Sequence, residues 1–332
     1  MSPSKKDYIE FADPEVLRVL LANGVGDGIG ITYADAAAVT SIGTWFRNNT
    51  EITSFDEFEY FGITSIPAYG FQGCTNLVSI TLPSSVTFIG SDAFSGCSAL
   101  TGTLTILSSV TSIGARAFQN CMFNNIYNYS RRAYNANIYA YRTENFGAGG
   151  GTFYLAGSIN GGGYSGGYNW LFANIIVDGN WAASGNHQIV KLSSGTGVKQ
   201  IRIGGDVSDS GYANDSIATG TGGTLEFLEV MGTKTGTGNA KFVTNDAGYY
   251  NGAIIHLGYN GIATTPAVCS ASSSRIAHIY VGDGSSAAHD DAILAQYLAD
   301  ADWAQYSAKL DTWYNYVQSG GEYSTPPTIP TE

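Results

Sequence analysis

Three phenylalanines recur in the first half of the chain at intervals of 23 and 24 residues, and a cysteine follows each of them after three residues. The set comprises Phe71, Cys74, Phe94, Cys97, Phe118 and Cys121. A single unit of this length cannot bury its own apolar residues, so successive units must stack on one another. The repeat therefore predicts a solenoid in which the phenylalanines and cysteines form a buried structural ladder.

The cysteines have no chemical role in this interpretation. No pair has the C-x-x-C spacing of a zinc or redox site, and four cysteines, including the distant Cys269, are too few for a disulfide scaffold. With 332 residues, of which 44% are hydrophobic, the chain can bury a large core without such crosslinks. We expect Cys97 and Cys121 to be reduced and buried, with Phe94 and Phe118 stacked beside them.

The units resemble the BspA-type leucine-rich repeats, whose pattern is close to I-G-x-x-A-F-x-x-C-x-x-L with a period of roughly 23 residues. One unit matches at Ile89, Gly90, Ala93, Phe94, Cys97, Leu100 and Leu104, and the unit before it at Ile66, Phe71, Cys74, Leu77, Ile80, Leu82 and Pro83. The resemblance implies an α+β repeat fold, a leucine-rich-repeat-like β-solenoid with helical caps at both ends. Such repeats are found in surface proteins of gut bacteria and in their phages.

The sequence divides into five parts. They are an N-terminal helical cap over residues 1–50, regular repeats over 51–124, an irregular continuation of the solenoid over 125–283, a C-terminal helical cap over 284–318 and a Pro-rich tail over 319–332. Beyond Cys121, runs rich in Ile, Val, Phe and Tyr recur every 22 to 28 residues and end in Gly, Asn or Asp, as strands followed by turns do. A separate β-helix or sandwich over residues 125–275 is the alternative.

Both ends have the composition of caps, which a repeat array needs to cover its terminal apolar layers. From Ser285 onward the apolar residues follow a helical spacing. We expect one helical face with Ile293, Leu294, Tyr297 and Leu298, followed by a second with Trp303, Tyr306, Leu310, Tyr314 and Val317.

The N-terminal segment is similar to a cap module that contains a Ca²⁺-loop-like sequence. The candidate metal ligands are Asn23, Asp27 and Asp35. Asn23 replaces the usual first Asp and Val25 occupies a ligand position, although a calcium loop needs several oxygen ligands. We therefore expect a degenerate loop that packs as a cap and no cofactor, with calcium binding as the less favoured alternative.

The net charge of −12 is concentrated at the two ends of the chain. Residues 1–60 carry ten acidic and four basic groups, residues 283–332 carry eight and one, and the residues between carry nine and ten. No basic face is available to bind phosphates, which argues against a nucleic-acid partner and against an anionic membrane surface. No apolar run reaches the length of a membrane-spanning helix, so we expect no membrane insertion.

Catalytic residues are not evident. None of the four histidines, His187, His256, His278 and His289, has a metal-binding spacing. Because His256 and His278 lie 22 residues apart in predicted strands, we expect them to stack on one face in a structural role. Polysaccharide cleavage needs a converging pair of carboxylates, and the candidates Asp178, Asp206, Asp209, Glu226 and Glu229 do not show one. We expect no enzymatic activity, with a polysaccharide-degrading β-solenoid as the second alternative.

The aromatic content points to binding instead. Tyrosines gather with arginine, asparagine and glycine between residues 124 and 170, a composition that binding surfaces use for rigid contact and adaptable hydrogen bonds. The candidate ligand-binding residues are Tyr127, Tyr129, Arg131, Tyr134, Tyr139, Tyr141, Tyr164, Tyr168 and Trp170. The alternative is that these residues pack the solenoid.

The function expected from these observations is that of a non-catalytic structural or interaction protein whose solenoid surface binds a protein or a glycan. No export signal is visible at the N-terminus, and virions assemble in the host cytoplasm without one. We therefore expect a phage virion component, head-decorating or tail-associated, that contacts a host-cell surface or neighbouring virion proteins, with homo-oligomerisation as an option. A secreted or cell-surface bacterial adhesin is the first alternative.

Overall fold

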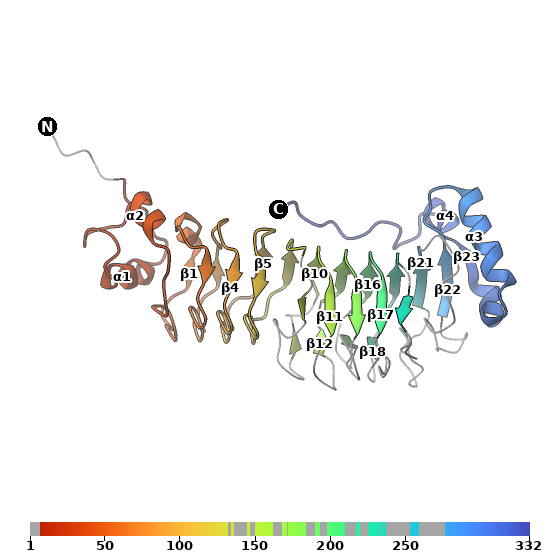
Figure 1. Cartoon of the computed structure of the whole chain (residues 1–332), viewed down its shortest axis with the longest axis horizontal. Helices are drawn as coiled ribbons and strands as arrows, with labels where there is room; N and C mark the ends of the chain where they lie inside the picture. Colours follow the sequence, from red (N-terminus) through yellow and green to blue (C-terminus); the bar gives the residue numbers. More distant parts are fainter. Residues whose placement is uncertain are drawn as a thin grey trace. The chain divides into compact units, whose positions relative to one another are not determined.

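The computed structural model describes residues 7–131, 134–135, 145–146, 150–161, 168–170, 172–183, 190–192, 198–209, 217–219, 225–232, 234–236, 253–258 and 276–332. They form two compact units that divide after Asn124 (Figure 1). Unit 1 contains the described residues up to Asn124, and unit 2 contains those from Asn125 onward.

Unit 1 begins with two short helices, as expected for a helical cap. Helix α1 (Pro14–Ala22) has Asp13 as its N-cap and a proline in its first turn, and it buries Val16, Val19 and Leu20. Helix α2 (Tyr33–Ala38) starts with a capping box between Thr32 and Asp35. The other carboxylate oxygen of Asp13 accepts the backbone N–H of Thr53 at 2.6 Å, which ties α1 to the first repeats.

The repeats of unit 1 are coils with very short parallel strands. One sheet contains β2 (Ser65–Ile66), β4 (Phe88–Ile89) and β6 (Ser112–Ile113), and a second contains β1 (Ser54–Phe55) and β3 (Ser79–Ile80). The unit also contains the 3₁₀ helix η1 (Asp56–Tyr60) and strand β5 (Thr103–Ile106). The isoleucine of each strand in the first sheet is buried and the residue before it faces outward, because side chains alternate along a strand.

A left-handed backbone residue recurs in the coils of unit 1. Tyr69, Asp92 and Arg116, one coil apart, have φ of 64°, 55° and 58°. At this bend the backbone N–H groups face the following coil, where the N–H of Phe94 donates to the carbonyl of Ala117 at 2.8 Å. Hydrogen bonds between coils therefore replace the longer strand ladders of an ordinary sheet.

The expected ladder of phenylalanines lies in the centre of unit 1. The rings of Phe71, Phe94 and Phe118 are buried and nearly parallel, with centroids 5.2 and 5.5 Å apart and interplanar angles of 3° and 4°. The ladder begins one coil earlier than the sequence analysis recognised, because Phe46 stacks on Phe71 at 5.4 Å. Asn49 occupies the cysteine position in that first coil, which concealed the unit.

The cysteines of the ladder are free and buried, and they bond to the backbone of the preceding coil. The thiols donate to phenylalanine carbonyls in the pairs Cys74–Phe46, Cys97–Phe71 and Cys121–Phe94, at 2.9, 3.0 and 3.1 Å. The adjacent Cys121 thiol and burial raise the pKa of Cys97, so this side chain stays a neutral hydrogen-bond donor. The thiols therefore satisfy buried carbonyls that no helix or sheet pairs.

Unit 2 continues as a parallel β-solenoid with three sheets. Sheet 1 has the order β23-β22-β21-β19-β16-β13-β10-β7, formed by Leu310–Thr312, Ile276–Val281, Ala253–Leu257, Phe227–Val230, Gln200–Ile203, Asn174–Val177, Thr152–Leu155 and Asn125–Asn128. Sheet 2 has the order β20-β17-β14-β11-β8, formed by Lys234–Gly236, Val207–Asp209, Trp181–Ala183, Ile159–Gly161 and Tyr134–Asn135. Sheet 3 has the order β18-β15-β12-β9, formed by Ile217–Thr219, Val190–Leu192, Tyr168–Trp170 and Asn145–Phe146. The described part of residues 125–283 thus continues the solenoid, in place of the separate domain considered as an alternative.

The core of unit 2 lies behind sheet 1, where apolar residues stack in register. One inward row contains Phe153, Ile175, Ile201, Leu228 and Ile255, all buried. Because each strand pairs over several residues, aliphatic side chains stack from coil to coil without the Phe/Cys signature. The strands found by sequence around Gly151, Ala173, Val198, Leu225 and Ala253 are confirmed as β10, β13, β16, β19 and β21.

The C-terminal end contains α3 (Ala287–Ala299), the 3₁₀ helix η5 (Ala301–Lys309), strand β23 and α4 (Trp313–Gln318). The expected buried positions Ile293, Tyr297, Trp303 and Tyr306 are confirmed. The prediction of a continuous second helical face is wrong, because Leu310 begins strand β23 and this strand resets the helical phase. As a result Trp313 and Tyr316 are the buried residues of α4, while Val317 and also Leu298 of α3 are exposed and Tyr314 is only partly buried.

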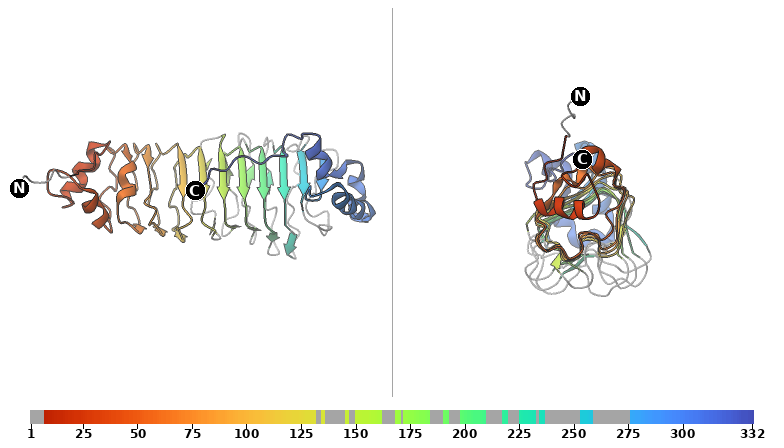
Figure 2. Two further views of the ribbon diagram at one scale, coloured as in Figure 1. Left: turned by 90° about the horizontal axis from the view of Figure 1, so that it is seen from above. Right: turned by 90° about the vertical axis from the view of Figure 1, so that its left-hand side faces the viewer.

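The Pro-rich tail is packed against unit 2. After α4 the chain turns back and runs along sheet 1, as both views of this region show (Figures 1 and 2). Tyr323 is buried on the sheet, and the hydroxyl of Tyr129 in the segment after β7 donates to the carbonyl of Pro330. None of the described helices has the length and hydrophobicity that crossing a bilayer requires.

Candidate functional site

The outer face of sheet 1 carries a row of large and polar side chains. Consecutive strands place them in register in the order Tyr127, Tyr154, Ile176, Arg202, Glu229, His256, Tyr280 and Asp311. They alternate along each strand with the inward core residues, so they point away from the core. We refer to this set as the outer row.

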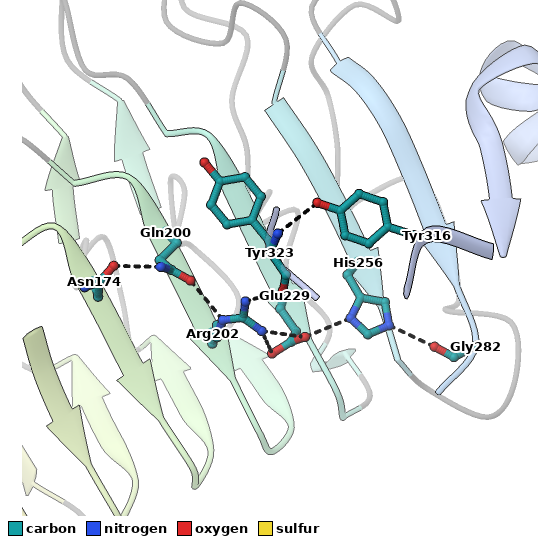
Figure 3. Close-up of polar contacts among 8 residues, drawn as sticks. All are labelled: Asn174, Gln200, Arg202, Glu229, His256, Gly282, Tyr316 and Tyr323. Atoms are coloured by element: carbon teal, nitrogen blue, oxygen red, sulfur yellow. Dashed lines mark hydrogen bonds and ion pairs between the residues drawn. The ribbon is translucent and has the colours of Figure 1, made fainter. Parts of the chain in front are cut away.

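Polar side chains of the outer row and its neighbours form a continuous network across the strands (Figure 3). The amide of Gln200 donates to Asn174 at 2.7 Å, and Arg202 Nε donates to Gln200 Oε1 at 2.9 Å. Arg202 Nη1 lies 3.2 and 3.1 Å from the two carboxylate oxygens of Glu229. Arg202 is 4% exposed, so this is a buried ion pair whose polar atoms are matched by further hydrogen bonds.

His256 continues the network and has a structural environment. Its Nδ1 lies 2.9 Å from Glu229 Oε1 and its Nε2 lies 2.8 Å from the carbonyl of Gly282, which places both ring nitrogens opposite acceptors. The imidazole is 1% exposed and stacks on Trp313 with centroids 3.7 Å apart. Burial alone would raise the pKa of Glu229, but the bond from His256 and the charge of Arg202 hold that pKa below its ordinary value.

The predicted stacking of His256 on His278 is wrong. His256 is in register with Tyr280, whereas His278 is in register with Ile254. The pairing of β21 with β22 shifts between Ala253 and Ile254, and an irregularity of this kind moves a side chain along the strand. A spacing of 22 residues therefore did not place the two imidazoles at one level.

The C-terminal segment covers the network. Tyr323 donates from its hydroxyl to Glu226 Oε2 at 2.6 Å, and its carbonyl accepts Arg202 Nη2 at 2.6 Å. Its ring stacks on Phe227 with centroids 4.8 Å apart and an angle of 8°. Trp313 and Tyr316 of α4 complete this apolar cover. The network therefore anchors the C-terminal segment to the sheet and offers no open cleft.

The predicted tyrosine set is spread over different sheets. Tyr127 lies in β7 of sheet 1, Tyr134 in β8 of sheet 2, and Tyr168 and Trp170 in β12 of sheet 3. Arg131 is exposed. The remaining candidates, Tyr139, Tyr141 and Tyr164, lie outside the described residues.

Tyr129 has a packing role next to the tail. Its ring lies 5.6 Å from that of Tyr154, while its hydroxyl bonds to Pro330. The hydroxyl of Tyr154 donates to Asp178 at 2.6 Å, and burial together with this carboxylate raises the pKa of Tyr154. Tyr129 therefore belongs to the contact between the tail and sheet 1.

The candidate calcium ligands serve separate local roles. Asp27 Oδ1 accepts the backbone N–H groups of Ile29 and Gly30, both at 3.1 Å. Asp35 belongs to the capping box of α2, and the Asn23 amide donates to the carbonyl of Val19 at 2.8 Å. Among the described residues, the cluster with metal-like proximity is instead Asp283, His289 and Asp290, and Asp290 already accepts the backbone N–H of Tyr314.

The described carboxylates considered for catalysis are bound to neighbouring side chains. Asp178 accepts a hydrogen bond from Tyr154, Glu226 from Tyr323, and Glu229 from Arg202. Asp209 lies in β17 of sheet 2, away from the sheet that carries these glutamates. The structure thus distributes the candidates over separate contacts.

Two hollows lie on unit 1, and the sequence analysis identified neither. The first, a groove of 380 Å³, is lined by Glu59, Ile80, Thr81, Leu82, Ser84, Thr103, Leu104, Thr105 and Leu107. The second, of 420 Å³, is lined by Asp7, Tyr8, Ile9, Glu10, Tyr33, Glu57 and Tyr60. The groove draws residues from successive coils, so only the recurrence of threonine beside the buried isoleucines and leucines could have indicated it.

Comparison with known proteins agrees with the repeat. Residues 36–144 match the model of the BspA type leucine rich repeat region, in six copies. A search of curated proteins and a search of solved structures gave no significant match. The match begins before the coil of Phe46, which the ring ladder also includes. Residues 36–144 are therefore a BspA-type leucine-rich-repeat region, and a solenoid of this family suggests a role in protein interaction or surface binding.

Proposed function

We propose that this chain is a non-catalytic binding protein whose unit 1 groove takes a neutral glycan on a host-cell surface. The observation that carries the proposal is the contrast between two faces. The outer row of unit 2 is covered by the chain's own C-terminal segment, whereas the unit 1 groove is open and lined by hydroxyl groups.

The chemistry of the groove suits a sugar. Thr81, Ser84, Thr103 and Thr105 are exposed and present hydroxyls that both donate and accept, as sugar hydroxyls require. Glu59 adds an acceptor, and isoleucine and leucine side chains supply apolar contact for the C–H faces of a ring. No lysine or arginine lines the groove, so an anionic polysaccharide has no counter-charge there.

The test is binding of the full chain to a panel of immobilised neutral and acidic glycans. We expect a neutral glycan to be retained, and the double variant Thr103→Ala/Thr105→Ala to weaken that binding by about tenfold or more, equivalent to roughly 1.4 kcal/mol. Ser112→Ala, an exposed position of β6 outside the groove, is the matched control and should bind as the natural chain does. Equal binding by the double variant, or retention of acidic glycans only, would contradict the proposal.

We also propose that the protein is a virion component of a phage, head-decorating or tail-associated. The support is the resemblance of the repeats to those of phages of gut bacteria. Mass spectrometry of purified virions tests it: the protein should copurify with the particles. Recovery only from culture medium or from the bacterial surface would favour an adhesin.

The degrading-enzyme alternative has its own test. Incubation with host polysaccharide followed by a reducing-end assay should show no release of sugar ends if the protein only binds. Sustained release would replace the binding proposal with a catalytic one.

A further inference from the structure

The C-terminal tail lies on sheet 1 in the manner of a bound peptide. Helix α4 ends at Gln318, and the chain reverses through Ser319, Gly320 and Gly321, where Gly320 has φ of 73°. A side chain at Gly321 would meet the ring of Tyr316, so this hinge depends on glycine. Beyond the hinge the tail contains no helix or strand, and its hydrogen bonds to the solenoid come from residues of unit 2.

One side chain anchors the tail. Tyr323 is 9% exposed, whereas the residues after it are exposed or half-buried. The site that receives it consists of Phe227 under the ring, Glu226 at the hydroxyl, and Arg202 at the carbonyl. The backbone N–H of Tyr323 donates to the Tyr316 hydroxyl at 3.0 Å. We refer to these four residues as the tyrosine site, because a buried aromatic anchor within weaker contacts is how interfaces concentrate binding energy.

The rest of the tail is suited to lie across the strands. Pro326, Pro327 and Pro330 favour an extended polyproline conformation, which loses little entropy on binding. The seven residues from Tyr323 to Pro330 cover about 22 Å at about 3.1 Å per residue. Four strand spacings of about 4.8 Å, from β19 to β7, amount to roughly 19 Å, so the chain length matches the contact that Pro330 makes with Tyr129.

We infer that the tyrosine site also binds the tail of a second copy of this chain, so that copies can be linked by tail exchange. Every tail contact described above is non-covalent and would form identically with a tail supplied by another copy, which is the requirement for exchange of a terminal segment. The glycine hinge is the only element that directs the tail back onto its own sheet. This inference is independent of the unit 1 groove, so either can fail alone.

The first experiment measures binding of a labelled peptide with the sequence of residues 319–332 to the full chain carrying Tyr323→Ala. This variant keeps its tail but lacks the anchor, so we expect the peptide to bind the variant at least tenfold more tightly than it binds the natural chain. A peptide with Tyr323→Ala should not bind, and a peptide with Tyr323→Phe should bind more weakly, because it cannot reach Glu226. Thermal melting of the variant checks that it is folded.

The inference is overturned if the folded variant does not bind the natural peptide, or if it binds the alanine peptide equally well. The second experiment removes Gly320 and Gly321 from the full chain, so that the tail can no longer fold back. We expect light scattering to show a dimer at micromolar concentration, and Tyr323→Ala in the same chain to restore the monomer. A chain with two glycines inserted at the hinge is the matched control and should remain monomeric. A shortened chain that stays monomeric, or a dimer that persists without Tyr323, would rule out tail exchange.

Discussion

The two units solve the same stacking problem with different residues. In unit 1 the strands of the three-stranded sheet are two residues long, and the coils are joined by stacked phenylalanines and by thiols bonded to the preceding coil. In unit 2 the strands of sheet 1 are mostly four or more residues long, and aliphatic rows suffice. The comparison teaches that the Phe/Cys signature compensates for short strands, so its loss beyond Cys121 does not mean the end of the solenoid.

The outer surfaces differ as well. Unit 2 buries a charged network beneath its C-terminal segment, whereas unit 1 exposes hydroxyl groups in a groove. Binding is therefore expected where the chain does not cover itself, and stability of the C-terminal end where it does.

The largest expected effect tests the ladder. Phe94→Ala removes the ring between two stacked neighbours and leaves a cavity, so the free energy of unfolding should fall by about 3–5 kcal/mol. Denaturant titration measures this loss. Phe88→Ala, at a position that is 40% exposed, is the matched control and should cost less than about 1 kcal/mol. Similar losses in both variants would contradict a special role for the ladder.

The next effect tests the network of unit 2. Glu229→Gln removes the negative charge between Arg202 and His256, and breaking a buried ion pair costs about 3 kcal/mol. Hydrogen exchange of α4 should increase more than that of the ladder coils, because the network holds the C-terminal segment. Uniform protection in both units would show that the network does not anchor it.

A smaller effect tests the thiol bonds. Cys97→Ala leaves the carbonyl of Phe71 without its buried donor, so the free energy of unfolding should fall by about 1–2 kcal/mol. Cys97→Ser, which keeps a donor, should recover part of that loss. Equal stability of the alanine variant and the natural chain would mean that the thiol only fills space.

The smallest effect is a pH dependence. The pKa of Glu229 lies below its ordinary value of 4.5 in the folded chain, so its ionised form stabilises the fold. This contribution is fully present above about pH 4.5 and is lost as the pH falls through the lower folded pKa. Between about pH 5 and 3 the natural chain should therefore lose stability more steeply than Glu229→Gln, as measured by denaturant titration at each pH. Parallel slopes would contradict this.

The sequence predicted what is periodic. Phe71, Phe94 and Phe118 could be placed because identical side chains recur at one interval, and the apolar runs of β10 to β21 were recognised for the same reason. Phe46 was missed because Asn49 breaks the pattern at the cysteine position.

Contacts between segments far apart in the chain could not be predicted. Tyr323 meets Glu226 and Arg202 across 97 and 121 residues, and no repeat links these positions. The level of His256 depended on a local shift in strand pairing, and the groove depends on which threonines of successive coils lie side by side. Both are properties of the three-dimensional register.

The thiol-to-carbonyl bonds also have a mechanical consequence. Each cysteine reaches back by one coil, so the coils of unit 1 are fastened in series, like links. A force applied along the chain would detach one link at a time, and each step would release the 23 or 24 residues between successive cysteines. At about 3.5 Å per extended residue, the released length is roughly 80 Å. A protein fastened in this way yields in regular steps under tension.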